Sequence, residues 1–129
     1  MSKTNALRQL DRAGIKYEVL EYDIPYEEFS GTRVAETLGM DMGACYKTLA
    51  LRNGHDIYIC VIPVNREIDL KKCAQEIGVR KNKGIYFDSE VTNHETIEVS
   101  AEAYGMSVKL NRDELLGFLK AQVKDISGE

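Results

Sequence analysis

Apolar side chains recur at two different periods along the chain. In four segments they lie three or four residues apart, which is the spacing of one face of a helix. A residue whose side chain can cap a helix precedes each segment: Ser2 or Thr4, Ser30, Asp69 and Asn111. The first three segments also end at a glycine, the usual residue just past a helix: Gly14, Gly39 and Gly78. The pattern therefore predicts four short helices.

The other period is two, which is typical of strands with one buried face. Residues 44–52 and 56–64 alternate in this way on either side of Asn53-Gly54. This dipeptide supplies the positive φ angles of a tight turn, so the two segments are predicted to form a β-hairpin.

A second hairpin is predicted from residues 95–101 and 106–110, which alternate around Tyr104-Gly105. Residues 15–22 also read as a strand, whereas residues 79–86 show no clear period. Helices and hairpins are interspersed, so we expect an α/β fold with a mixed, mostly antiparallel sheet and packed helices. No repeat or linker divides the chain, and a single domain over residues 1–129 is expected.

Composition excludes several classes of protein. With 43% apolar and 29% charged residues, the chain is not intrinsically disordered. Its longest apolar run, residues 57–64, is far short of the roughly 18 residues of a membrane span, so a cytoplasmic protein without a membrane partner is expected. The three cysteines have no metal-ligand spacing and are expected to be reduced, and no nucleotide-binding fingerprint occurs. Neither a metal nor a cofactor is predicted.

Charge is unevenly distributed. The net charge is −4, yet residues 65–83 contain six basic and three acidic side chains. A basic face on an acidic body suits a polyanion bound at one place, although such a run is also typical of a solvated surface.

One residue does not fit its strand. In residues 44–52, Lys47 shares a face with Cys45, Leu49 and Leu51. Its ammonium must reach solvent past its neighbours, or enter a pocket where it binds phosphate or stabilises developing negative charge. Cys45 is a weaker candidate for a nucleophile, because no histidine partner is evident.

Several motifs resemble the YbaK/EbsC family of aminoacyl-tRNA deacylases, the freestanding relatives of the editing domain of bacterial prolyl-tRNA synthetases. They occur in this order: Leu10-Asp11-Arg12-Ala13-Gly14-Ile15, Glu21-Tyr22-Asp23, Cys45-Tyr46-Lys47-Thr48-Leu49, Val61-Ile62-Pro63-Val64, Ile68-Asp69-Leu70-Lys71-Lys72, Ile77-Gly78, Arg80-Lys81 and Ile97-Glu98-Val99-Ser100-Ala101.

The resemblance implies hydrolysis of the ester between a wrongly attached amino acid, usually cysteine or alanine, and proline tRNA. The family's lysine matches Lys47, and its substrate-binding positions match Tyr22, Thr48, Pro63 and Ser100. The tRNA is expected on the basic face, contacted by these residues: Arg66, Lys71, Lys72, Arg80 and Lys81. Prolyl-tRNA synthetase and a second copy of the chain are further candidate partners.

The chain departs from the family in two places. The family's glycine-rich Gly-Gly-x-Ser-Pro-x-Gly loop is missing between Lys83 and Phe87, and Glu102 replaces the usual glycine after Val-Ser-Ala. We therefore expect a shallow, open groove beside Lys47 and Tyr22 instead of a closed pocket. The alternative function is an inactive module that binds tRNA, a synthetase or another protein.

Overall fold

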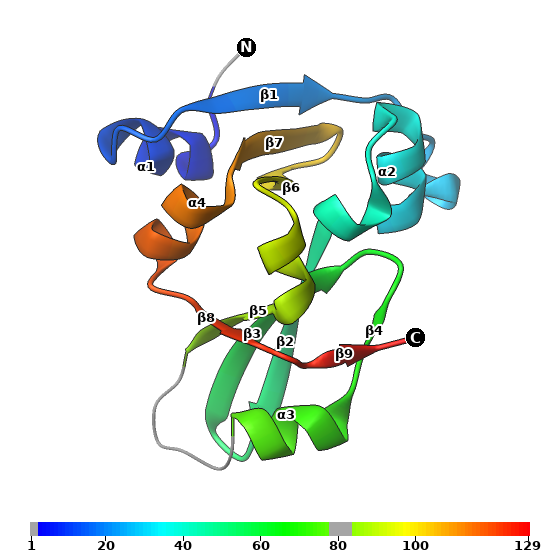
Figure 1. The fold of residues 1–129 in the computed structure, drawn as a ribbon. Helices are drawn as coiled ribbons and strands as arrows, with labels where there is room; N and C mark the ends of the chain where they lie inside the picture. Colours follow the sequence, from blue (N-terminus) through cyan, green and yellow to red (C-terminus); the bar gives the residue numbers. More distant parts are fainter. Residues whose placement is uncertain (1–2, 78–83) are drawn as a thin grey trace.

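A computed structural model describes residues 3–77 and 84–129 of the chain. Its strands form two main sheets, arranged one above the other in Figure 1. The upper sheet has the order β1-β7-β6 and is antiparallel throughout, with β1 at Tyr17–Glu21, β6 at Thr96–Ala103 and β7 at Met106–Asn111. The predicted second hairpin supplies β6 and β7.

The lower sheet has the order β2-β3-β5-β8. The Asn53-Gly54 hairpin joins β2 (Tyr46–Asn53) to β3 (Asp56–Pro63), and Gly54 has a φ of 64°. Strand β5 (Ile85–Asp88) then runs parallel to β3, and β8 (Gln122–Lys124) runs parallel to β5. The predicted mixed, mostly antiparallel α/β fold is confirmed.

A small third sheet pairs β4 (Glu67–Ile68) with β9 (Ser127–Gly128). This pairing places the C-terminal residues beside the segment just before α3 (Leu70–Glu76). Strands β4, β5, β8 and β9 were not predicted.

The four predicted helices are present, and each has the expected cap. The helices are α1 (Asn5–Arg12), α2 (Gly31–Leu38), α3 and α4 (Arg112–Leu119). Their capping side chains each accept a hydrogen bond from a backbone N–H in the first turn: Thr4, Ser30, Asp69 and Asn111. Three short 3-10 helices complete the structure: η1 (Tyr26–Glu28), η2 (Met42–Ala44) and η3 (Ser89–Asn93).

The main hydrophobic core lies between the two large sheets, where α1 and α4 cover it from one side (Figure 1). It joins side chains from both sheets and both helices, among them Leu7, Val61, Phe87, Leu110 and Leu115. A second core fills the space between the lower sheet and α3. Strand β3 is therefore buried on both faces along its C-terminal half, which explains the apolar run from Cys60 to Pro63. No helix in the described part of the chain is long and apolar enough to span a membrane.

Candidate functional site

Strands β2 and β6 form a fork. They meet at one isolated parallel bridge, between Glu98 of β6 and Cys45, the residue just before β2. Beyond this bridge they separate, with β2 as the edge strand of the lower sheet and β6 as the edge strand of the upper sheet. Polar side chains that follow the bridge on either strand therefore lie beside the opening of the fork.

Lys47 lies just beyond the bridge and is half-buried. Leu49 and Leu51, on the same face of β2, pack against the core beneath α3, so the predicted apolar face is confirmed. Within residues 3–77 and 84–129, no hydrogen bond or ion pair is formed by the Lys47 ammonium. A half-buried cation without an internal partner is available to an anionic ligand.

The closed end of the fork contains a buried carboxyl group. Glu98 is only 4% exposed, and the side chains of Ser107 and Cys45 hydrogen-bond to it. Burial raises the pKa of Glu98, and burial together with this carboxyl raises the pKa of the Cys45 thiol to about 12. Burial of this thiol and its raised pKa both disfavour the thiolate, which argues against Cys45 as a nucleophile.

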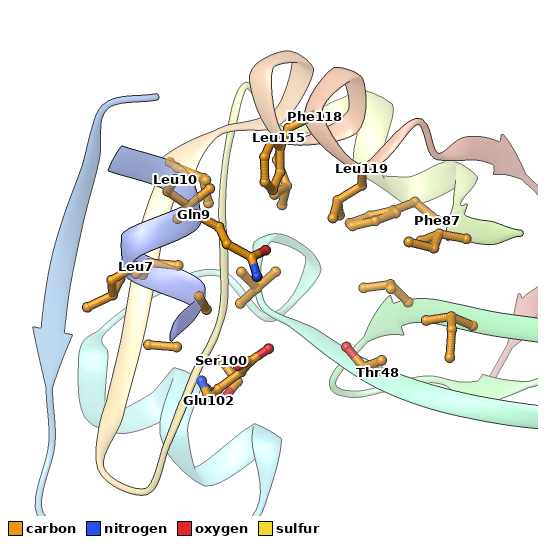
Figure 2. A pocket seen from close by; sticks show the side chains of 18 residues that line it. Leu7, Gln9, Leu10, Thr48, Phe87, Ser100, Glu102, Leu115, Phe118 and Leu119 are labelled. Carbon is orange, nitrogen blue, oxygen red and sulfur yellow. Dashed lines mark hydrogen bonds between the residues drawn. The ribbon is translucent and has the colours of Figure 1, made fainter. Parts of the chain in front are cut away.

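The open side of the fork leads into a cavity of about 410 Å³ between the two sheets. Its walls are apolar, and Leu7, Val61, Phe87 and Leu115 are among the residues that form them. Four exposed polar residues lie at its mouth: Gln9, Thr48, Ser100 and Glu102. In Figure 2, Thr48 lies on one side of the opening, with Ser100 and Glu102 on the other. This combination of an apolar interior and a few polar groups is typical of a ligand site.

The structure separates the predicted substrate-binding residues. Thr48 and Ser100 line the cavity, whereas Lys47, Tyr22 and Pro63 do not. Tyr22 stacks on Phe29 with ring centroids 6.3 Å apart, and Pro63 is fully buried opposite Tyr46 in the hairpin. The open cavity therefore lies on the Thr48 face of β2, not beside Lys47 and Tyr22 as expected. The reason is alternation, because consecutive side chains of a strand point to opposite faces.

The predicted tRNA-contacting residues also differ in their surroundings. Arg66 donates to the Ser127 carbonyl, and Lys72 contacts the same carbonyl and the Asp125 carboxylate at 2.9 and 3.1 Å. These two side chains therefore bind the C-terminal segment around Asp125 and Ser127. Lys71 is exposed, beside a shallow hollow that Glu67, Asp69 and Glu129 also line. Arg80 and Lys81 lie outside the described residues.

Two residues of the site, Glu98 and Glu102, were assigned no binding role from the sequence. Glu98 lies in the period-two pattern on the polar face of β6, where it is buried in contact with Ser107 of β7 and with Cys45, the residue just before β2. Glu102 has a φ of 64°, in the left-handed region, at an irregularity in β6 between Ser100 and Ala103. The family's glycine at this position was the signal for that backbone conformation.

The described residues contain no group of three or more His, Cys, Asp or Glu side chains that could hold a metal ion. All three cysteines, Cys45, Cys60 and Cys73, are free thiols, as expected. The polar groups that the strands place beside the fork are the Lys47 ammonium, the hydroxyls of Thr48 and Ser100, and the Glu102 carboxylate.

Comparison with solved structures shows the fold first. The chain superposes on a solved "putative trans-editing enzyme for prolyl tRNA synthetase" with a TM-score of 0.79 and 16% identity, covering 99% of this chain and 100% of that one. The solved "hypothetical protein APE2540" gives a TM-score of 0.79 and 15% identity, with 96% and 100% coverage. The fold is thus that of a YbaK-like α/β domain.

Sequence comparison then identifies a curated relative. The Enterococcus faecalis protein named "Putative Cys-tRNA(Pro)/Cys-tRNA(Cys) deacylase EbsC" is 28% identical over 153 aligned positions, which cover 97% of this chain and 93% of the relative. No protein-family model matches the chain. The resemblance to the YbaK/EbsC-type family is confirmed. Because the alignment is longer than the 129-residue chain, the relative contains internal residues that this chain lacks.

Proposed function

We propose that this protein hydrolyses the ester bond of an aminoacyl-tRNA. In this reaction water adds to the ester carbonyl, and the tetrahedral intermediate carries a negative charge on the carbonyl oxygen. Collapse of the intermediate releases the free amino acid and restores the terminal hydroxyl of the tRNA. The ester is already activated, so an oriented water and a positive charge beside the oxyanion suffice for catalysis.

The observation that carries the proposal is the similarity to EbsC along nearly the whole chain, with a lysine whose ammonium has no partner within the described residues. Lys47 is proposed to stabilise the oxyanion. Because β2 is an edge strand, the flexible side chain can pass around the free edge toward an ester bound in the fork. Thr48 and Ser100, at the cavity mouth, are proposed to bind the ester or the terminal ribose.

The name of the relative makes cysteine attached to proline or cysteine tRNA the first substrate to test, followed by alanine on proline tRNA. Lys71, together with Arg80 and Lys81, is the proposed contact to the tRNA acceptor stem. Arg66 and Lys72 would contribute less, because both already bind the C-terminal segment. Tyr22 is retained as a proposed wall on the Lys47 side, and Pro63, paired with Tyr46, as a proposed wall on the opposite face of the hairpin. Prolyl-tRNA synthetase or a second copy of the chain are retained as proposed partners in the cytoplasm.

One observation favours the alternative, a module that binds tRNA without catalysis. Lys47 does not line the cavity that Thr48 and Ser100 share. If the ammonium cannot reach the ester, charged tRNA would bind with a salt-dependent affinity and its ester would decay at the uncatalysed rate.

Release of radiolabelled amino acid from cysteinyl- and alanyl-tRNA(Pro) by the purified protein tests the proposal. The Lys47→Ala variant should lower the rate by about 100-fold or more, because removal of one oxyanion-stabilising group has an effect of this size. Arg52→Ala, on the same strand at an exposed position, is the matched control and should retain full activity. Wild-type activity in a folded Lys47→Ala variant would remove this lysine from the mechanism. Binding without hydrolysis by the wild-type protein would support the alternative.

A further inference from the structure

We propose that the cavity between the sheets binds the side chain of an aminoacyl group that is larger and more apolar than cysteine or alanine, and that Glu102 binds its α-ammonium group. This inference rests on the proposed function and names the substrate class of the same site. It follows from the size of the cavity, the composition of its mouth and the conformation of Glu102.

The size of the cavity is the first argument. About 410 Å³ lies within the range of small-molecule sites, and the lining is almost entirely apolar: Leu7, Leu10, Ile59, Val61, Ile85, Phe87, Val99, Val108, Leu110, Leu115, Phe118 and Leu119. An alanine or cysteine side chain would fill only a small part of this volume. A branched or aromatic side chain such as that of leucine or phenylalanine would bury far more apolar area against them, which is the main source of affinity in such a site.

The mouth gives the second argument. Gln9, Thr48 and Ser100 are neutral, so among the described residues that line the cavity Glu102 alone carries a charge. A carboxylate at this position disfavours fatty acids and other anions, and favours a ligand with a positive charge beside its apolar part. In an aminoacyl ester, the side chain, the ammonium and the ester all branch from one carbon atom. The cavity, the Glu102 carboxylate and the hydroxyls of Thr48 and Ser100 provide a matching set of partners around one opening.

The conformation of Glu102 is the third argument. Its φ of 64° lies in the left-handed region, where a side chain other than that of glycine is costly. The Glu102 N–H donates to the Ser100 hydroxyl at 3.1 Å, which couples these two rim residues. Within residues 3–77 and 84–129 the Glu102 carboxylate forms no ion pair. A glutamate at this strained, exposed position forms no ion pair within these residues. Binding of a ligand therefore explains its presence better than a contribution to stability does.

Binding of non-hydrolysable probes tests the inference without catalysis. The probes are 3′-amino-3′-deoxyadenosines linked by an amide to leucine, to alanine or to 4-methylpentanoic acid, which is leucine without its amino group. Each additional buried methylene contributes roughly fourfold in affinity, so the leucyl probe should bind at least tenfold more tightly than the alanyl probe by calorimetry. The 4-methylpentanoyl probe should bind about threefold more weakly than the leucyl probe, and Glu102→Gln should abolish this difference.

Filling the cavity provides a second test. Ala6 lines it from α1, so Ala6→Leu should remove the preference for the leucyl probe and leave binding of the alanyl probe within about twofold. Arg8→Leu adds the same side chain to an exposed position of the same helix outside the lining, and should retain the preference. Circular dichroism melting establishes that each variant is folded before its binding is compared.

Deacylation of leucyl-, phenylalanyl-, cysteinyl- and alanyl-tRNA in parallel separates this inference from the proposed function. Binding of the leucyl probe with the expected effect of Glu102→Gln, but no hydrolysis of any ester, would support the inference and contradict the deacylase. Hydrolysis of cysteinyl- or alanyl-tRNA, with a leucyl probe that binds no more tightly than the alanyl probe, would overturn the inference and leave the deacylase standing. An unchanged difference between leucyl and 4-methylpentanoyl probes in Glu102→Gln would remove Glu102 from ammonium recognition.

Discussion

The two edges of the lower sheet use their polar side chains in opposite ways. At the β8 edge, Asp88 is 2% exposed and accepts hydrogen bonds from the backbone N–H groups of Ile126 and Ser127 at 3.1 and 3.0 Å. Arg66 and Lys72 donate to the Ser127 carbonyl of the same segment. The charged groups near this edge are therefore occupied by hydrogen bonds to the C-terminal segment of the chain itself.

The β2 edge is different. It meets the upper sheet at one bridge, and the charged and hydroxyl groups beyond it, on Lys47, Thr48, Ser100 and Glu102, are half-buried or exposed beside an open cavity. Charge alone therefore does not identify a binding face. Two basic residues of the β8 edge stabilise the chain itself, whereas the lysine of the β2 edge remains available to a ligand.

Asp88→Ala should have the largest effect on stability, because it removes an acceptor from two buried backbone N–H groups. Hydrogen bonds to a charged group contribute about 1.5–3 kcal/mol each, so a loss of about 3 kcal/mol in the free energy of unfolding is expected. Urea denaturation followed by circular dichroism measures it. Asp125→Ala, at the exposed partner of Lys72, is the control and should cost less than about 1 kcal/mol. Equal losses in the two variants would contradict the role of Asp88 at this edge.

Glu98→Gln should make the stability of the fold less dependent on pH. Burial raises the folded pKa of Glu98 above its usual value of 4.5, so the native state holds this proton more tightly than the unfolded state. The stabilisation is fully present below pH 4.5 and is lost as pH rises through the folded pKa. At pH 4 the variant should be less stable than wild type by about 1 kcal/mol, because its amide fits the Ser107 and Cys45 donors less well.

As pH rises, wild type should lose stability relative to Glu98→Gln, so the difference between their free energies of unfolding should shift in favour of the variant. Chemical denaturation of both proteins at several pH values between 4 and 8 measures it, with Glu95→Gln at an exposed position as the control. Parallel stability curves for wild type and Glu98→Gln would mean that the carboxyl is not desolvated in solution.

Glu102→Gly should stabilise the fold by about 1 kcal/mol, because glycine adopts the positive φ of this position without a steric cost. The gain is partly offset by the greater entropy of glycine in the unfolded chain. Thermal denaturation should show the increase, and Glu114→Gly, in helix α4, should show a decrease. A loss of stability in Glu102→Gly would mean that the carboxylate makes a stabilising contact.

Lys72→Ala should have the smallest effect. Its ion pair with Asp125 is partly exposed, so the variant should lose less than about 1 kcal/mol of stability. Its affinity for tRNA, measured by filter binding, should stay within about twofold of wild type. Lys71→Ala, which changes a neighbouring exposed lysine, should weaken binding and reduce the salt dependence. Weaker tRNA binding by Lys72→Ala, with unchanged binding by Lys71→Ala, would show that Lys72 contacts the tRNA.

Much of the fold could be predicted because its signals are local. Capping residues and the Asn53-Gly54 and Tyr104-Gly105 turns act within a few neighbouring residues, and the helices and both hairpins form where they predict. Strand β5 could not be predicted in this way. Its parallel partner β3 lies more than 20 residues earlier, so the pairing is not specified by neighbouring residues.

The sequence by itself determined that Lys47 lies on an apolar strand face, and the structure confirms this because side chains of a strand alternate wherever the strand is placed. The tertiary structure decided which polar groups are free. Glu98 is buried through a contact 53 residues away along the chain, and Lys72 is engaged by a segment of similar separation. It also placed the cavity on the Thr48 face, because an opening between two sheets depends on how both are covered by α1 and α4, and no local pattern records that.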